Sequence, residues 1–481
     1  MIMNFLDEAL GALRKCFSRE ATHSWFAAMV IGMMLRTDKL GVTSMIRALD
    51  LAPRYDSAVR VFRSEAWCLE EAEDAWAGFV AGSAPLVRVG GLTVQVTDGV
   101  KVIKEGRRIP AVKRLHQESG NSAKPEYINV HLYGAVGVLA EANEKTYCIP
   151  LACEIQEGMK KIMSWRYGDS GERQDSHVAE SIYLSYYVGE SLGDTVLLAD
   201  RLYLTVPALE ELDWLNGNKG RRMELVTLAK SNATAYEEPP KRAPGDRGRT
   251  RIKGRNVKLR ELFKERAGEF KTVTANIYGE GQEVRYLAVD LLWGKKLYRK
   301  MRFVLTILDG RETILACTDT SMDTLDIIEL YARRYTIEGT FRALKQDVAA
   351  FSNRFWTLEM PKLDRYAESG EVDRAAYVTG KGDREKVLNA FDANERYAFC
   401  GVVALGLLQM ISLKFFADNN NANLRYQRTP PKKLPSEAGV ADFLRKSIFR
   451  LLEKAPELAI SRKILGLMRD PDNIYEKKMV S

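Results

Sequence analysis

Four side chains between residues 331 and 345 have types and a spacing suited to chemistry on phosphate groups. They are Tyr331, Arg334, Glu338 and Lys345. In a continuous helix, at about 100° per residue, they would fall within a strip of about 60°. A carboxylate in line with two cations and a phenol would place a metal-binding acid beside a phosphate backbone. The pattern therefore indicates phosphoryl-transfer chemistry on nucleic acid.

An apolar strip lies beside the polar one on the same predicted helix. It is formed by Ile337, Phe341, Leu344 and Val348. This periodicity predicts an amphipathic helix anchored in a core. Taken alone, Glu338 has a second interpretation as one partner of a surface ion pair with Arg334 or Arg342, which would contribute little stability.

Two further acids follow predicted strands. Asp98 comes after the alternating run at 92–97 and before Gly99, and Asp200 comes after the apolar run at 195–199. Acids just beyond strand ends meet at the carboxyl edge of a sheet, where α/β folds hold ligands. Each acid also has a simpler interpretation, Asp98 as part of an ordinary turn and Asp200 as a loop cap.

Asp98, Asp200 and Glu338 together would make an oxygen-only metal site. Carboxylates without a nearby His or Cys suit Mg²⁺, with Mn²⁺ possible. Two such ions would activate a water or a 3′-hydroxyl and stabilise the leaving oxygen of an in-line displacement. We therefore expect these three residues to be both the catalytic residues and the metal ligands.

The charge of the chain favours a polyanionic partner. The 481 residues carry a net charge of +8, and the segment 241–266 alone holds eleven Lys or Arg against three acids, also +8. A solvated loop is the simpler interpretation of such a segment, but next to a phosphoryl-transfer site we expect it to contact the DNA backbone. The run at 295–302 is a second such patch, and the candidate contacts of the two are Lys253, Arg255, Lys295, Lys296 and Arg299.

Periodicity predicts four regions in an α/β protein. Residues 1–88 read as a helical, DNA-binding N-terminal domain, built either around a helix-turn-helix-like pair or as a plain helical bundle. Residues 89–230 and 301–420 alternate strands and helices and predict a mixed sheet. Residues 231–300 read as a β-rich basic insertion, and 421–481 as a helical C-terminal tail. The apolar run from Ala398 to Leu413 predicts a buried core helix rather than a membrane span.

These residues resemble a known family. The spacing of Tyr331, Arg334, Glu338 and Lys345 matches the YREK signature of bacterial insertion-sequence DDE transposases. The stretches VQVTDGVKV and LLADRLYLT look like the first and second Asp motifs of that group. The resemblance covers residues 90–350 well and the N-terminus in outline, and it does not extend to the tail after residue 420.

The resemblance implies a ribonuclease H-like core that binds two Mg²⁺ ions through Asp98, Asp200 and Glu338. It also implies that Tyr331, Arg334 and Lys345 contact phosphates of the transposon end, and we expect Arg342 on the same helix to do so as well. The implied partners are double-stranded DNA, both inverted-repeat ends and target, and a second copy of the chain in the synaptic complex. A cytoplasmic, nucleoid-associated bacterial enzyme without a membrane partner is expected.

Three functions remain open at this point. The first is cut-and-paste transposition, in which the element's ends are cleaved and their 3′-hydroxyls are joined to target DNA. The others are a catalytically silent DNA-binding regulator derived from a transposase and a metal-dependent nuclease acting on other DNA. Some relatives cut the second strand through a DNA hairpin that an aromatic side chain stabilises. In this sequence only Trp293 and Tyr298 are candidates for that aromatic side chain, and both are weak ones.

Overall fold

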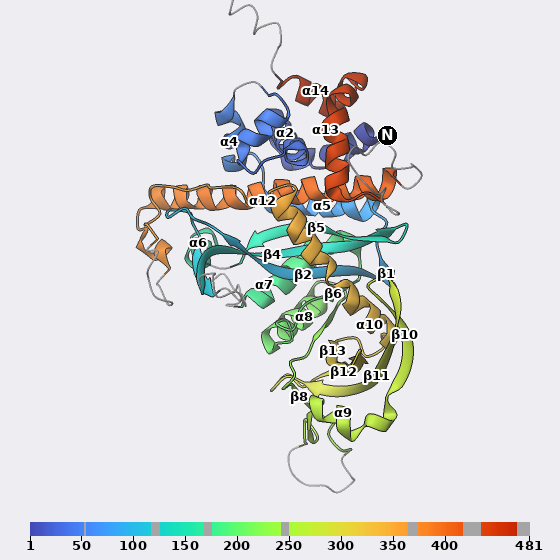
Figure 1. Ribbon diagram of the computed structural model, residues 1–481. Coiled ribbons are helices and arrows are strands. Elements are labelled where there is room, and N and C mark those ends of the chain that lie inside the picture. Colours follow the sequence, from blue (N-terminus) through green and yellow to red (C-terminus); the bar gives the residue numbers. More distant parts are fainter. Residues whose placement is uncertain are drawn as a thin grey trace, which may run out of the picture. The chain divides into compact units, whose positions relative to one another are not determined.

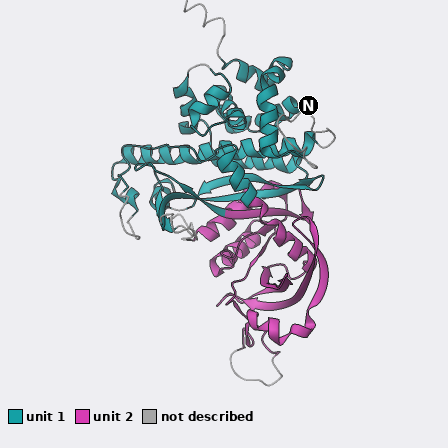
Figure 2. Ribbon diagram, viewed as in Figure 1, with its two compact units in different colours: residues 1–85, 99–173, 338–481 teal, residues 86–98, 174–337 magenta. Residues whose placement is uncertain are grey.

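The computed structural model describes residues 1–51, 54–116, 126–156, 158–167, 176–241, 250–363, 373–416 and 434–468. Helices and strands alternate along these residues, and the sheets contain parallel and antiparallel pairs, so the fold is mixed α/β. The chain forms two compact units, shown in Figure 2. Unit 1 contains residues 1–85, 99–173 and 338–481, and unit 2 contains residues 86–98 and 174–337.

This division differs from the predicted one in three places. The predicted core is divided between the units, because residues 99–173 and 338–420 are in unit 1 with the N-terminal helices. The β-rich segment 231–300 is part of unit 2, because its long strands pair with strands that come later in the same unit. The C-terminal helices belong to unit 1 together with the N-terminal helices. Neither segment is a separate unit.

The sheet of unit 2 begins with three parallel strands. β6 (Thr195–Leu198) lies between the first part of β2 (Leu92–Ile103) and β7 (Met223–Leu228) and is parallel to both. β13 (Arg311–Cys317) pairs with β7 in the antiparallel sense, and β12 (Arg299–Leu308) pairs with β13. All four residues of β6 are buried, as expected for a central strand with both faces covered.

The β-rich part of unit 2 extends this sheet. β11 (Glu280–Trp293) pairs with β12, and β10 (Lys271–Ile277) forms a hairpin with β11. The smaller elements of this unit are β1 (Arg88–Val89), β8 (Thr234–Tyr236), β9 (Asn256–Lys258) and α9 (Leu262–Glu265). The element that follows β13 is the helix α10 (Thr324–Arg333), which begins at the N-cap Asp323 and packs against β10.

Two helices of unit 2 bury their apolar sides in its core. α7 (His177–Val188) and α8 (Val206–Asn218) pack against each other. Thr205 caps α8 by accepting the N–H of Ala208, and Pro207 occupies the first turn, where a missing N–H costs nothing. The core that they share with the strands includes Ile182, Leu197, Leu212, Leu225 and Phe303.

Unit 1 is organised around the long helix α12 (Lys381–Phe415). As Figure 1 shows, α12 runs across β5 (Lys145–Ile155) on one side and beneath α2 (Glu20–Leu35) on the other. Residues 398–413 are all buried, which confirms the predicted core helix. Among the described residues α12 alone is long and apolar enough to cross a membrane, but 89% of its most apolar window is buried inside the protein, which is the pattern of a core helix.

The remaining elements of unit 1 complete this arrangement. They are α1 (Ile2–Ala12), α3 (Val42–Ala48), α4 (Tyr55–Arg63), α5 (Leu69–Ser83), β3 (Lys113–His116), β4 (Tyr127–Ala142), α6 (Lys160–Tyr167), α13 (Glu437–Lys454) and α14 (Ala459–Leu465). α3 and α4 pack on each other and on α2, and α4 also packs on α12, as members of a helical bundle. α14 docks on α1 and α2, where Asp7 Oδ1 accepts the N–H of Ile460 at 2.6 Å.

The helix predicted over 331–345 is interrupted, so the prediction of one continuous polar face is wrong. α10 ends at Arg333 and α11 (Thr336–Gln346) begins three residues later. At the junction the N–H of Arg334 bonds the carbonyl of Tyr331, a three-residue spacing in place of the four-residue spacing of an α-helix. The Thr336 hydroxyl also takes the Arg333 carbonyl as its acceptor at 2.8 Å, which competes with a helical N–H.

The apolar half of that prediction is confirmed. Ile337 is 1% exposed, and Phe341, Leu344 and Val348 are buried as well. Thr340 Oγ1 donates to the carbonyl of Cys148 on β5 at 2.6 Å, which fixes α11 within unit 1. The apolar stripe therefore anchors α11 even though the polar strip is divided between two helices.

Candidate active site

Asp98 and Asp200 lie at the same level along two neighbouring strands of unit 2. β2 and β6 are parallel neighbours, with Val96 opposite Leu198. Asp98 lies two residues beyond Val96 and Asp200 two residues beyond Leu198, so both lie at the carboxyl edge of these parallel strands. This is the edge at which α/β folds hold ligands.

The two aspartates differ in how the chain continues. Asp200 lies just beyond the end of β6, as predicted. Asp98 does not follow its strand but lies inside it, because β2 continues to Ile103. The expected strand end at Asp98, and with it the simpler interpretation of Asp98 as part of a turn, is therefore wrong. Val100 and Val102, which alternate and are both buried, continue the strand.

Backbone and side-chain contacts hold both carboxylates. Oδ1 of Asp200 accepts the N–H of Leu202 at 2.8 Å, a local turn that fixes the orientation of the carboxylate. Oδ2 of Asp98 accepts from Nη1 of Arg334 at 3.0 Å. The side chains of Asp98 and Arg334 are only 24% and 16% exposed, so this ion pair is largely shielded from water.

Tyr331 belongs to the same cluster. Burial, opposed by Arg334 and helped by the negative charges of Asp200 and Asp98, raises the pKa of Tyr331 to about 12. The phenol therefore stays protonated at neutral pH and can donate a hydrogen bond. Four predicted site residues of unit 2 are thus gathered at one sheet edge.

A fifth residue of this cluster was not predicted. Tyr203 is 4% exposed, and burial raises its pKa, with further contributions from Asp98 and Asp200. It lies three residues after Asp200 in the stretch LLADRLYLT. Its position in that motif is the one sequence feature that could have predicted a role for Tyr203, because a single tyrosine after an acid has no distinctive spacing.

The other predicted residues lie on α11 in unit 1. Glu338 is exposed in the first turn of the helix, and Arg342 is exposed one turn later. Lys345, also exposed, donates to the carbonyl of Lys101 at 3.4 Å. The helix therefore presents an acid and two cations to solvent.

The donor set suits a hard divalent cation. Asp98 and Asp200 offer carboxylate oxygens at one edge, the ligands that Mg²⁺ and Mn²⁺ prefer. Asp98 already forms an ion pair with the positively charged Arg334. In the parts of the chain that the structure describes, no three His, Cys, Asp or Glu side chains are grouped closely enough to hold a metal ion.

The predicted basic contacts of the insertion have different surroundings. Lys253 lies over the ring of Tyr236, 3.9 Å from its centroid, and Arg255 forms an ion pair with Glu237 at 3.1 Å. Lys295 and Lys296 are exposed. Residues 242–249 of the basic segment lie outside the described residues.

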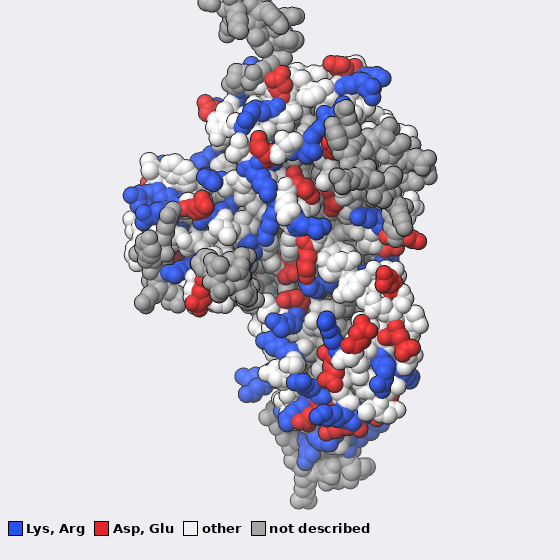
Figure 3. All heavy atoms as spheres, viewed as in Figure 1, with Lys and Arg blue, Asp and Glu red and all other residues white. Residues whose placement is uncertain are grey.

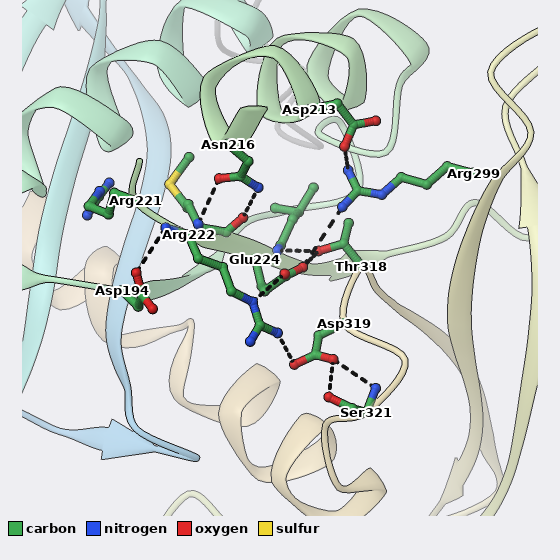
Figure 4. Close-up of polar contacts among 12 residues, drawn as sticks. Asp194, Asp213, Asn216, Arg221, Arg222, Glu224, Arg299, Thr318, Asp319 and Ser321 are labelled. Atoms are coloured by element: carbon green, nitrogen blue, oxygen red, sulfur yellow. Dashed lines mark hydrogen bonds and ion pairs between the residues drawn. The ribbon is translucent and has the colours of Figure 1, made fainter. Parts of the chain in front are cut away.

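Arg299 is held in a polar cluster, which Figure 4 shows. It forms an ion pair with Asp213 and lies 3.9 Å from Glu224, which also accepts from Arg222 at 2.8 Å. Arg222 and Glu224 lie at the start of β7, so this cluster is at the amino edge of the parallel strands. A DNA contact by Arg299 stays a prediction, and it would require these ion pairs to open.

An exposed aromatic pair was also missed. Tyr278 is 64% exposed and Tyr335 is 47% exposed, and their rings meet edge to face with centroids 4.8 Å apart. Tyr278 and Gly279 form the two-residue turn between β10 and β11, both with positive φ, and Glu329 of α10 accepts the N–H of Asn276 nearby. No local pattern signals this pair, because its partners are 57 residues apart in the sequence.

Comparison with known families agrees with this site. The sequence model of one family, described as DDE superfamily endonuclease, matches residues 12–277. The matched span includes Asp98 and Asp200 and ends before α10 and α11. Comparison with curated proteins found no match. Members of the matched family are nucleases and transposases that act on DNA with divalent metal ions. Because the match covers more than half of the 481 residues, this chain belongs to the DDE superfamily of endonucleases.

Proposed function

We propose that this protein is an insertion-sequence transposase of the YREK group. It cleaves the ends of its own element and joins the freed 3′-hydroxyls to target DNA by a cut-and-paste route. The observation that carries the proposal is the common level of Asp98 and Asp200 at the carboxyl edge of parallel strands, with Tyr331 and Arg334 beside them. This arrangement supports a ribonuclease H-like catalytic core.

In this proposal three carboxylates hold the metal ions. Asp98, Asp200 and Glu338 are the ligands, and Mg²⁺ is the expected ion, with Mn²⁺ as a substitute. When bound, two such ions supply an activated nucleophile and neutralise charge on the leaving oxygen. The carboxylate oxygens of these three residues are hard donors, which supports their role as ligands.

The polar residues around these acids orient the DNA. The guanidinium of Arg334 binds a phosphate through two donors, and Tyr331 donates a hydrogen bond from its hydroxyl. On the exposed face of α11, Lys345 binds phosphate as a point charge and Arg342 through its planar guanidinium. Lys253, Arg255, Lys295 and Lys296 add affinity for the backbone without reading sequence. The active assembly pairs two DNA ends and two copies of the chain, in the bacterial cytoplasm.

The test uses purified full-length protein and a duplex that carries the element's inverted repeats. Asp98→Asn, Asp200→Asn and Glu338→Gln should each lower Mg²⁺-dependent cleavage by more than about 100-fold while leaving end binding within about twofold. Asp309→Asn and Glu385→Gln, which change exposed acids elsewhere, serve as matched controls and should cleave normally. Substantial cleavage by any of the three site variants would remove that residue from the ligand set.

The second candidate is a nuclease that cuts without joining, because the matched family is described as an endonuclease. The same reaction distinguishes the two. A transposase gives cleaved ends and then products in which these ends are covalently joined to a target plasmid. Cleaved ends that never join, with every target tested, would favour the nuclease. Binding without either product in the wild type would favour a silent regulator.

A further inference from the structure

The helical bundle of unit 1 has a basic pocket that none of the predicted site residues lines. Its volume is about 440 Å³. Arginines from two helices contribute to it: Arg19 precedes α2, and Arg60 and Arg63 lie on α4. Ser18, Ser64 and Glu65 complete most of the wall. Three guanidinium groups against one carboxylate give the wall a net positive charge.

Two of these guanidinium groups have no competing partner. Arg19 and Arg60 are exposed, and in the described part of the chain neither side chain forms a hydrogen bond or an ion pair. Other arginines of the bundle are engaged, for example Arg14 with Glu20 and Arg445 with the carbonyl of Leu35. The side chains of Arg19 and Arg60 are therefore available to bind an anion.

Arg63 is more firmly placed. Its guanidinium lies over the ring of Phe355, 5.8 Å from the centroid, and donates to the Trp356 carbonyl at 3.4 Å. Burial lowers the pKa of Arg63, but an arginine remains charged in a protein. Most of its five donors are still available, since only one long hydrogen bond uses them.

The wall of the pocket is fixed from behind. Arg396 of α12 donates to the carbonyls of Ser64 and Trp67, both at 2.9 Å, and the N–H of Ser18 bonds the carbonyl of Ala66 at 2.9 Å. These bonds hold the segment after α4 against the segment before α2. A wall ordered in advance loses little entropy when it binds a ligand.

The backbone adds to the positive potential. Arg19 is the N-cap residue of α2, a helix of 16 residues without a side-chain cap, so the positive end of its dipole lies at the pocket. The acid in its first turn, Glu20, is already paired with Arg14 and with Lys463. The charge of Glu20 therefore offsets little of the potential that an anion would experience.

We propose that this pocket binds a phosphodiester group of duplex DNA through Arg19, Arg60 and Arg63. The inference rests on the proposed function, because the DNA is that on which the enzyme acts. Ala66 is the one apolar residue in the wall, so the pocket offers no surface for stacking a base and recognises phosphate alone. It contributes affinity, not sequence choice, outside the cleavage site.

The test is equilibrium binding of a fluorescent duplex to the full-length protein in EDTA, over a range of salt concentrations. Arg19→Gln and Arg60→Gln should each weaken binding and reduce the slope of log K against log salt by about 1, and the double variant by about 2. Arg450→Gln on α13, an exposed arginine outside the pocket, is the matched control and should keep the wild-type slope.

The outcomes separate the pocket from the proposed function. Wild-type affinity and slope in both pocket variants, with normal DNA binding by the wild type, would overturn the pocket alone. An equal loss of slope in the control would also overturn it, because the effect would then be one of overall charge. Absence of any DNA binding by the wild type would overturn the pocket and the proposed function together.

Discussion

The guanidinium of Arg334 donates to Oδ2 of Asp98 at 3.0 Å, and both side chains are mostly buried. A carboxylate proposed to bind a metal ion is therefore neutralised by a residue proposed to bind phosphate. The same arginine lies beside Tyr331 and lowers the pKa of that phenol. Without metal and DNA, Arg334 thus satisfies charges that would otherwise repel across the sheet edge.

Replacing Arg334 should separate its two roles. In Arg334→Gln the metal ion no longer competes with a guanidinium for Asp98, so half-maximal cleavage should need about fivefold less Mg²⁺, as a partly shielded ion pair contributes on the order of 1 kcal/mol. The maximal rate should fall at least about tenfold, because a phosphate contact is lost. The measurement is cleavage against Mg²⁺ concentration. Arg311→Gln is the control, and an unchanged Mg²⁺ requirement in Arg334→Gln would contradict the competition.

The turn at Tyr278 should carry strain. A two-residue hairpin turn with positive φ at both positions prefers Asn followed by Gly, whereas a bulky residue at φ 58° costs about 1 kcal/mol. Tyr278→Asn should relieve that cost but lose the edge-to-face contact with Tyr335, which contributes about 0.5–1.5 kcal/mol.

A double-mutant cycle separates these two terms. In a Tyr335→Ala background, Tyr278→Asn should raise the free energy of unfolding in urea by about 1 kcal/mol, and in the wild type by less. Equal effects in both backgrounds would mean that the two rings do not stabilise each other. Tyr278→Phe keeps the strain and should change little.

Two glycines of α12 should respond in opposite directions to the same substitution. A Cβ at Gly401 would come within 2.9 Å of the Cα of Ala350, so Gly401→Ala should lower the free energy of unfolding by roughly 1–3 kcal/mol. A Cβ at Gly382 meets nothing within 4 Å, so Gly382→Ala should stabilise the helix by up to about 1 kcal/mol. Thermal unfolding of both variants checks the pair, and stabilisation by Gly401→Ala would refute the close packing.

The buried carboxyls of unit 1 predict a pH-dependent stability. Glu73 is 2% exposed, and burial, together with Glu154, raises its pKa well above the ordinary value. From about pH 5 upward the folded state therefore holds a proton that the unfolded state has lost, so stability falls as pH rises, by up to about 1.4 kcal/mol per pH unit. Glu73→Gln should reduce this slope, as measured by urea unfolding at several pH values. Glu385→Gln should retain it, and a parallel slope in both variants would exclude Glu73 as the source.

Local periodicity was enough to predict much of the fold. The alternating run at 92–97 is in β2, the apolar run at 195–199 contains β6, and the run at 398–413 is a buried helix. In each segment a single pattern of apolar residues matches the burial of one strand or one helix. The common level of Asp98 and Asp200 also follows from two strands in parallel register.

What the sequence could not predict depends on contacts between distant residues. At the interruption near Arg334, the Thr336 hydroxyl donates to the Arg333 carbonyl. The periodicity of apolar residues does not indicate this hydrogen bond. Arg299 lies in a basic run typical of a DNA-binding surface, yet Asp213 from an earlier helix pairs with it. Tyr278 reaches Tyr335 only because the hairpin packs on α10.

The docking of α14 on α1 has a consequence for the synthesis of this protein. The ribosome makes α1 and α2 well before α14, whose Ile460 bonds Asp7 of α1. The parts of α1 and α2 that α14 covers therefore stay exposed to solvent until the last helices are made. Unit 1 completes its fold only after translation has passed α14, so a product that stops before α13 would lack a finished bundle.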